Sequence, residues 1–282
     1  MTIYQKTIEN SFTIKGYGIH TNQQVTITIH PAPANHGIVF KRIDQNNCLI
    51  PATIEFLKEY NRATLLSRNN IIIKTPEHLL SACAGLGLDN LLIDINNDEV
   101  PIFDGSSLTF INAFIKSGIK SLNEQKQPII IKSKTILKSN DASIICLPSK
   151  YPTFSYFLSY PKSFIGVQFF GMKLSQENYI NQIAPARTYG FYNEYLSLLE
   201  KGLAKGGSVD NAVVIKDDGY MNKLRFEDEL VRHKLLDLIG DCWILNRPII
   251  GHVIGIQSGH ALASQFTKKL AYQYAHLFNL NT

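Results

Sequence analysis

The sequence lacks an apolar stretch long enough to cross a membrane. A spanning helix needs about 20 apolar residues in succession. The longest candidate, 243–256, is interrupted at four positions, Asn246, Arg247, Pro248 and His252. The first twelve residues, MTIYQKTIENSF, also lack the apolar core of a secretory signal. The sequence therefore predicts no stable membrane insertion.

Cysteine is scarce. The four cysteines, Cys48, Cys83, Cys146 and Cys242, lie far apart and form no CxxC pair. This spacing is typical of free thiols in a reducing compartment, and it gives no sign of a disulfide framework. We therefore expect a cytoplasmic protein.

Long runs of one charge are also absent. The chain has 28 Lys and Arg against 23 Asp and Glu, a net charge of +5, and its Lys and Arg never form a run longer than two. Such a mild, scattered excess suits an anionic small molecule and does not indicate a nucleic-acid partner. With 45% hydrophobic and 18% charged residues, the 282-residue chain is an ordinary globular sequence, more typical of two domains than of one.

The first half alternates between strand and helix patterns. Strands are expected at 23–32, 37–43, 70–75 and 90–96. A helix should start near Pro76, capped by Thr75, and stop at Gly85 or Gly87. A second helix should use Asp104 or Ser106 as its cap and end at Gly118.

The polar segment 122–127 has no periodicity, and we expect the domain boundary there, with domains 1–124 and 125–282. Strands should follow at 128–137, 143–149, 153–161 and 211–215, and another at 251–256. Helices are expected at 187–202, 225–245 and 260–278. The predicted fold class is α+β, with two domains of similar topology. Each would be a layered β-sheet with two main helices, and the active site would lie between them.

The segment TPEHLL places Glu77 next to His78 at a helix start, so the two side chains diverge by roughly 100°. One could bind a metal while the other contacts a water on that metal. The arrangement is not HExxH, because only one histidine is local. Taken alone, the pair is more typical of a solvated helix end.

His233 and Asp237 stand four residues apart in RFEDELVRHKLLDLIGDCWIL, so one helix face carries both. Together with His78 they would supply two imidazoles and a carboxylate, the three-ligand set of a catalytic zinc site. An exposed i, i+4 pair is the alternative. Leucines around most of the helix favour an enclosed position.

His260 follows an apolar strand in the segment SGH and could protonate a leaving amine or stabilise an oxyanion. Asp241, one turn beyond Asp237, could hold the His260 ring and keep it charged. The alternative makes His260 a neighbour of the cap of the last helix.

Eight segments occur in the order seen in one family: GYGIHT, PAPANHGIVFKR, TPEHLLSACAGLGLDN, PIFDGSS, ARTYGF, GLAKGGS, LRFEDELVRHKLLDLIGD and SGHA. Over nearly its whole length the chain resembles the UDP-3-O-acyl-N-acetylglucosamine deacetylases, the zinc amidases at the committed step of lipid A synthesis. The resemblance implies hydrolysis of the N-acetyl group of a UDP-3-O-acyl-N-acetylglucosamine, giving acetate and a free amine. It also implies a small-molecule substrate and no nucleic acid, and we expect a monomer.

The resemblance implies one catalytic zinc ion, or iron(II) in the cell, held by His78, His233 and Asp237. Glu77 corresponds to the general base, His260 to the acid and Asp241 to the carboxylate that orients it. Two further residues correspond to positions near the reacting centre, Lys234 and Thr188.

The resemblance also implies substrate contacts. Phe191 and the segment GLAKGGS, with Gly207 and Ser208, correspond to the lining of an acyl-chain passage, Tyr160 to an aromatic residue against the uracil, and His20 to a histidine near the nucleotide. Helical spacing adds Tyr195 to an apolar wall beside Phe191, although an ordinary core helix explains that spacing too. Gln257 stands where many relatives have a basic residue, which affects one expected diphosphate contact.

Two other functions are compatible with these residues. One is a zinc peptidase, and the other is a binding module in which the metal only stabilises the fold. The missing HExxH counts against the first of them.

Overall fold

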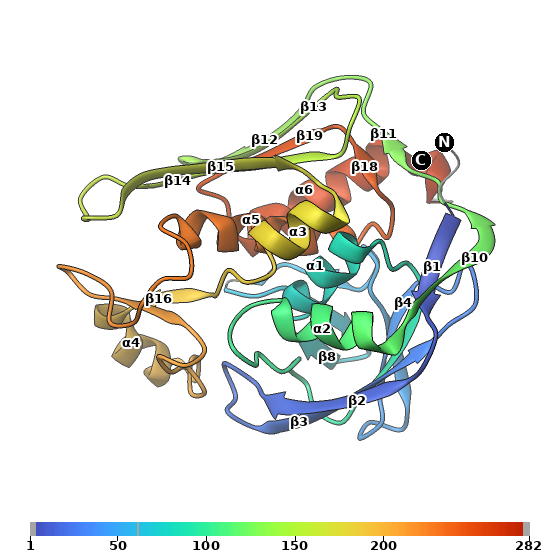
Figure 1. Cartoon of the computed structure of the whole chain (residues 1–282), viewed down its shortest axis with the longest axis horizontal. Helices are drawn as coiled ribbons and strands as arrows, with labels where there is room; N and C mark the ends of the chain where they lie inside the picture. Colours follow the sequence, from blue (N-terminus) through green and yellow to red (C-terminus); the bar gives the residue numbers. More distant parts are fainter. Residues whose placement is uncertain (1–3, 61, 279–282) are drawn as a thin grey trace.

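The computed structural model describes residues 4–60 and 62–278. Two five-stranded sheets form its outer layers and the main helices lie between them (Figure 1), so the α+β expectation is confirmed. Among the described residues, no helix combines the length and apolar character needed to cross a bilayer.

The N-terminal sheet has the order β2-β3-β9-β4-β5. The central strand β9 pairs antiparallel with β3 and parallel with β4. Its strands are β2 (Phe12–Tyr17), β3 (Gln24–Pro31), β4 (Ile38–Arg42), β5 (Cys48–Pro51) and β9 (Leu91–Ile95).

The C-terminal sheet repeats this arrangement in the order β12-β13-β19-β14-β15. Its late strand β19 likewise lies between two hairpins, antiparallel to β13 and parallel to β14. Its strands are β12 (Thr135–Ser139), β13 (Ala142–Leu147), β14 (Thr153–Tyr160), β15 (Gly166–Lys173) and β19 (His252–Ile256). The two halves are therefore copies of one topology, although no direct sequence repeat links them.

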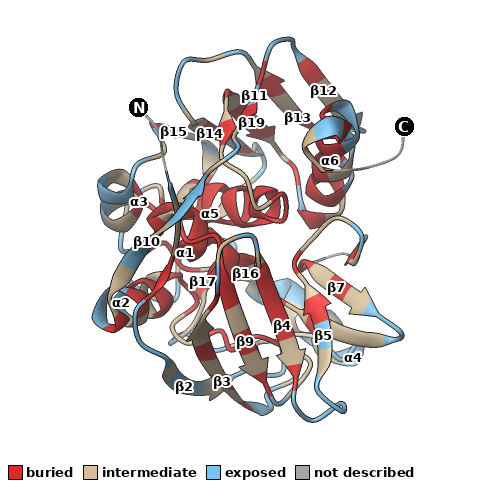
Figure 2. Cartoon of the chain, turned by 90° about the vertical axis from the view of Figure 1, so that its right-hand side faces the viewer, coloured by how far each residue is buried: buried red, intermediate tan, exposed pale blue. Residues whose placement is uncertain are grey.

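Four helices occupy the space between the sheets: α1 (Glu77–Leu86), α2 (Leu108–Ser117), α5 (Glu229–Trp243) and α6 (His260–Gln273). All of α1 and most of α5 are buried, because each helix has a sheet on one side and the other helix on its other side (Figure 2). This explains why both helices are apolar around most of their circumference.

Smaller elements complete the fold. They are β1 (Tyr4–Ile8) with β10 (Ile119–Gln125), β6 (Leu57–Lys58) with β7 (Leu65–Arg68) and β8 (Ile71–Lys74), and β11 (Ile129–Ile130) with β18 (Ile249–Ile250). The others are α3 (Gln176–Gln182), β16 (Tyr189–Phe191), η1 (Tyr192–Glu194), α4 (Tyr195–Glu200), β17 (Val213–Ile215) and η2 (Ala275–Leu277). The polar segment expected to separate the domains is largely strand, because β10 continues to Gln125 and pairs with β1.

Three local predictions were wrong. The cap residue of α2 is Ser107, not Asp104 or Ser106. Pro76, not Thr75, is the cap residue of α1, and no side chain caps this helix. Thr75 has a φ of 57°, and its hydroxyl lies 3.5 Å from Oε1 of Glu99. The helix expected over 187–202 starts only at Tyr195, because the segment before it pairs with β17 as strand β16. The expected stop at Gly202, with φ 74°, is confirmed.

Candidate active site

The close crossing of α1 and α5 creates the site. A Cβ on Gly240 would lie 2.1 Å from the backbone oxygen of Glu77, so only glycine allows this approach. The hydroxyl of Ser81 donates to the backbone oxygen of Leu236 at 2.8 Å and ties the helices further along. The N-terminal turn of α1 therefore faces the middle of α5.

His78, His233 and Asp237 meet at this crossing. Their possible ligand atoms all lie within 4.8 Å of one another. The side chains are 3–7% exposed, so the surface pair considered as an alternative is excluded. Oδ1 of Asp237 lies 3.3 Å from Nε2 of His233 and 3.6 Å from Nε2 of His78.

These separations fit a shared divalent cation. Four ligands about 2.1 Å from a tetrahedral ion lie roughly 3.4 Å apart. Nδ1 of His233 faces the backbone oxygen of Ala186 at 3.1 Å, so an N–H there leaves Nε2 with a free lone pair. Nδ1 of His78 is buried without a partner among the described residues. Burial lowers the pKa of His78, which keeps the ring neutral, as a metal ligand must be.

Lys234 holds the second oxygen of the same carboxylate. Its Nζ donates to Oδ2 of Asp237 at 2.7 Å. Burial alone would raise the pKa of Asp237, but His233 and Lys234 outweigh it and hold that pKa well below its usual range. Burial likewise opposes the charge on Lys234, yet Asp237 raises its pKa above the usual value. Asp237 is therefore ionised, with Oδ1 directed at the two histidines.

Glu77 and His260 lie beside this cluster. Nε2 of His260 is 3.8 Å from Oε1 of Glu77 and 3.9 Å from Oδ2 of Asp237. Burial raises the pKa of Glu77 to about 8, against the attraction of His260. For His260 burial acts in the opposite direction, but the carboxylates of Asp241 and Glu77 prevail and raise its pKa to about 9. The site thus pairs a carboxyl that readily takes a proton with an imidazole that readily keeps one.

Asp241 contacts the other nitrogen of the same ring. Its Oδ2 lies 3.0 Å from Nδ1 of His260. The hydroxyl of Thr64 donates to Oδ1 of Asp241, and the Thr64 backbone N–H donates to Oε2 of Glu77 at 3.1 Å. Sequence reasoning missed Thr64, because it precedes β7 in a segment without any motif and is 177 positions away from Asp241. No local signal could have identified it.

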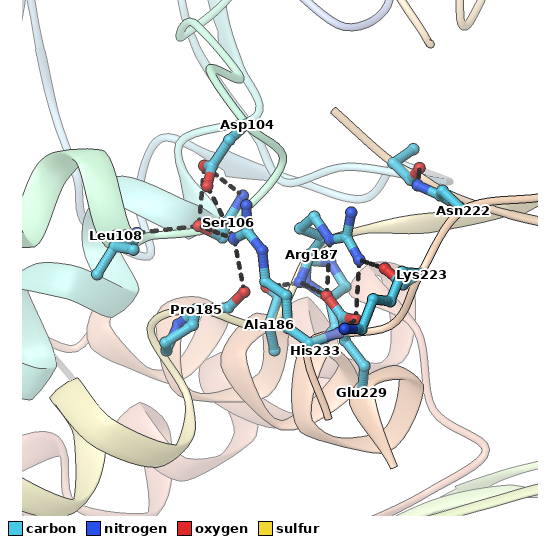
Figure 3. A network of polar contacts seen from close by, with 12 residues as sticks. Asp104, Ser106, Leu108, Pro185, Ala186, Arg187, Asn222, Lys223, Glu229 and His233 are labelled. Atoms are coloured by element: carbon cyan, nitrogen blue, oxygen red, sulfur yellow. Dashed lines mark hydrogen bonds and ion pairs between the residues drawn. The ribbon is translucent and has the colours of Figure 1, made fainter. Parts of the chain in front are cut away.

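The start of α5 is anchored by a buried ion pair (Figure 3). Glu229, the first residue of α5, is fully buried and accepts from Nε of Arg187 at 2.8 Å and from the Arg187 backbone N–H at 3.0 Å. Nearby, Arg225 donates to Asp104 of the N-terminal half and to the backbone oxygen of Pro185. These contacts fix the loop that carries Ala186, just before β16, against the helix that carries His233.

Known proteins are similar to this sequence over nearly its whole length. The model of the UDP-3-O-acyl N-acetylglycosamine deacetylase family matches residues 5–272. Three bacterial proteins named UDP-3-O-acyl-N-acetylglucosamine deacetylase are similar to this chain. The chain is 38% identical over 270 residues to that of Geotalea uraniireducens strain Rf4, covering 95% of this chain and 88% of the relative. It is 39% identical over 271 residues to that of Chlamydia pneumoniae, covering 94% and 96%, and 37% identical over 271 residues to that of Geobacter sp. strain M21, covering 95% and 89%.

The chain belongs to this family. The resemblance inferred from the eight sequence segments is thereby confirmed. The matched span contains every residue of the buried cluster described above, from Thr64 to His260.

The structure groups the expected substrate contacts in two places. Tyr160 packs edge-on against Phe191, with ring centroids 5.2 Å apart, and its hydroxyl lies 3.2 Å from that of Tyr189. Tyr189 in turn faces His233 at 6.3 Å between centroids. Tyr195 begins α4 a few residues further on.

His20 lies against the glycine-rich segment instead. The backbone N–H of Ala204 points at Nδ1 of His20 at 3.4 Å, and Gly206 donates to the backbone oxygen of Ile19 at 2.9 Å. Gly207 and Ser208 continue this segment.

Thr188 and Gln257 are held mainly by backbone contacts. The backbone N–H of Thr188 donates to the backbone oxygen of Gly105, and the Thr188 carbonyl accepts from the backbone N–H of Val213. Thr188 lies two residues after Ala186, whose backbone oxygen faces His233. The amide of Gln257 makes two bonds to the backbone of Ser159, so it closes the end of β14. The Gln257 side chain is therefore already engaged with the backbone of this strand.

Proposed function

We propose that the chain hydrolyses the N-acetyl group of a UDP-3-O-acyl-N-acetylglucosamine, releasing acetate and a free glucosamine amine, and so serves lipid A synthesis. Family membership at 37–39% identity over nearly the whole chain carries this proposal. The buried pair of Glu77 and His260 beside the His78, His233 and Asp237 cluster supports it, since amide hydrolysis needs a base, an acid and an electrophile at one point.

His78, His233 and Asp237 would hold the metal, with zinc as the proposed ion. Two imidazoles and one carboxylate are the donor set of catalytic zinc, although they suit iron(II) as well. A bound cation of this kind polarises an amide carbonyl and lowers the pKa of a coordinated water. Lys234 keeps Asp237 ionised and occupies its second oxygen, which leaves one oxygen for the metal.

Glu77 acts as the general base in this proposal. Its raised pKa matches the role, because a carboxylate with a pKa near the working pH accepts a proton more readily than an ordinary one. The Thr64 N–H bond to Oε2 holds the carboxylate in place and leaves Oε1 directed at the neighbouring His260. A water placed beside Oε1 would lose its proton to Glu77 as it attacks the acetamide carbon.

His260 completes the reaction as the acid. An amide does not expel an unprotonated nitrogen anion, so the leaving amine must receive a proton. The raised pKa keeps His260 protonated at neutral pH, and Asp241 holds the ring by its other nitrogen. The charged ring, Lys234 and Thr188 would stabilise the oxyanion, each such donor typically lowering the barrier by about 3 kcal/mol.

The aromatic group around Phe191 and Tyr160 would bind the substrate outside the reacting centre. A long acyl chain on such a surface supplies binding energy far from the amide. We propose that Phe191 and Tyr195 contact the acyl chain with Gly207 and Ser208. His20 and Tyr160 remain the proposed contacts of the nucleotide part.

The deciding experiment measures acetate release from UDP-3-O-(3-hydroxyacyl)-N-acetylglucosamine by the purified protein, before and after treatment with a chelator. Turnover that stops with chelator and returns with limiting zinc supports the proposed reaction, substrate and metal together. If turnover returns with iron(II) alone, the metal of this site is iron(II) and not zinc. A zinc peptidase would instead cleave peptides. A structural metal would unfold the protein on removal, which circular dichroism would detect.

We also propose that the protein works as a cytoplasmic monomer. All residues of the candidate site come from one chain, so the site needs no partner subunit. Three of its four free cysteines are buried, as expected of stable thiols in a reducing compartment. Light scattering on the purified protein tests the oligomeric state.

A further inference from the structure

The outer face of the C-terminal sheet carries several large apolar side chains although it faces away from the core. Alternate residues of each strand point toward α5 and α6, such as Ile144 and Val253, which are fully buried. Their neighbours Ile145 and Ile254 point the other way. In Figure 1 the five strands form the upper boundary of the molecule, and no helix or strand lies beyond them.

A continuous row of side chains crosses all five strands of this face. Paired positions run from Lys138 on β12 to Ser143, Ile256, Phe157 and Phe169 on β15. Phe169 is 62% exposed, and Val167, two residues before it, is 58% exposed. Two large apolar side chains with so much exposed surface, neighbours on one face of a strand, are unusual where only water covers that face.

The N-terminal sheet provides an internal comparison, because it has the same topology. The corresponding row across its outer face passes through Thr13, Thr28, Asp94 and Lys41, and ends at the exposed Leu49 on β5. The two threonine hydroxyls are 2.9 Å apart, and Lys41 pairs with Asp94 at 2.8 Å. A polar, charge-paired outer face is therefore compatible with this fold, and the apolar face of the C-terminal sheet is not a requirement of it.

Positive charge gathers around the apolar face. Residues 125–174, which form β11 to β15, contain seven lysines and one acidic residue, Asp141, for a net charge of +6. The other 232 residues together carry −1. The charge excess is therefore unevenly distributed along the chain. Six of the seven lysines are exposed: Lys132, Lys134, Lys138, Lys150, Lys162 and Lys173.

The combination of exposed apolar side chains and surrounding lysines indicates one kind of partner. A nucleic acid would match the charge but would leave Val167 and Phe169 in water. A bilayer containing anionic phospholipid matches both, because apolar side chains enter the acyl boundary while lysines contact the headgroups. We propose that the outer face of the C-terminal sheet binds reversibly to the surface of an anionic membrane.

Such binding would leave the reaction centre accessible. α5, which carries His233, packs against the inner face of this sheet, and α1, which carries Glu77 and His78, packs against α5. The protein could therefore turn over substrate while it is attached. The proposal does not depend on the reaction proposed above.

The test is co-sedimentation of the full chain with vesicles of phosphatidylcholine alone or with 40% phosphatidylglycerol, at low and high salt. We expect binding only to the anionic vesicles, weakened by salt. Each lysine near such a surface contributes about fivefold to partitioning, so Lys138→Glu with Lys173→Glu should reduce binding more than 20-fold. Phe169→Ser should reduce it about tenfold.

Matched controls lie on α2 of the other half, where Ile115 and Lys116 are exposed as well. Ile115→Ser and Lys116→Glu should bind vesicles like the unchanged protein, and all four variants should keep the Tm of the parent. Three results would overturn the proposal: no binding to anionic vesicles, equal loss in the α2 controls, or binding that Phe169→Ser leaves unchanged and that a single-stranded oligonucleotide displaces. The last result would indicate a partner recognised by charge alone.

Discussion

Oδ2 of Asp241 lies 3.0 Å from Nδ1 of His260, while Nε2 of the same ring lies 3.8 Å from Oε1 of Glu77. One imidazole thus stands between two carboxylates that come from α5 and α1. Among the ion pairs of the described residues, the one between Nε2 of His260 and Oδ2 of Asp237, at 3.9 Å, links His260 to the metal cluster.

This separation predicts different effects for two aspartates one helical turn apart. Asp237→Ala should lose the metal, because it removes a ligand. Asp241→Ala should keep the metal and lower kcat about 10²-fold, because His260 loses the carboxylate that keeps it charged. Metal analysis and turnover measurements on both variants test this prediction. Equal loss of metal from the two variants would contradict the separation of roles.

Thr64 should act as a positioning residue. Thr64→Val keeps the backbone N–H that holds Glu77 but removes the hydroxyl that donates to Asp241. We expect kcat to fall about tenfold with KM unchanged and full metal content. Thr64→Ser should restore most of the rate, since it keeps the hydroxyl. If serine is as slow as valine, the contact with Asp241 is not the cause.

The Arg187–Glu229 pair predicts how stability depends on pH. Burial opposes ionisation of Glu229, but bonds from Arg187 and Arg225 prevail and lower its pKa below the usual 4.5. A lowered carboxyl pKa means that the stabilisation is complete above pH 4.5 and is lost as pH falls through the folded-state pKa.

Glu229→Gln should therefore destabilise the protein by about 3 kcal/mol near pH 7, because it leaves Arg187 without its counter-charge. The free energies of unfolding of variant and parent should converge as the pH falls below 4.5. Urea titrations across this range measure both. If the difference in free energy of unfolding between variant and parent stays constant with pH, the pair stabilises the protein through packing and not through charge.

Gly240 should not tolerate a side chain. Although alanine favours helices, a Cβ at this position would lie 2.1 Å from the Glu77 oxygen, so Gly240→Ala must push α5 away from α1. Overpacking of this kind costs about 1–3 kcal/mol and would also move the metal ligands apart. Gly219→Ala is the control, because nothing lies within 4 Å of its added Cβ. Tm and metal affinity should both fall in the first variant only.

The sequence predicts best what depends on neighbouring residues. His233, Asp237 and Asp241 could be assigned to one helix face because spacings of four residues are local, and the α+β pattern followed from hydrophobic periodicity. The helical pattern at 187–202 failed in its first part, because Arg187 is tied to Glu229, 42 positions away, and Tyr189 pairs with Val213. Thr64 was missed for the same reason. Contacts between distant segments leave no trace in local spacing.

The place of β19 within the second sheet has a consequence for the newly made chain. This strand lies between β13 and β14, and it is the last of the five to leave the ribosome. His260 follows four residues after it. Until about residue 260 has emerged, the two hairpins of the C-terminal half have no strand to join them, and Glu77 and Asp241 have no imidazole between them. Closure of the second sheet and the arrival of His260 therefore coincide, once about residue 260 has emerged.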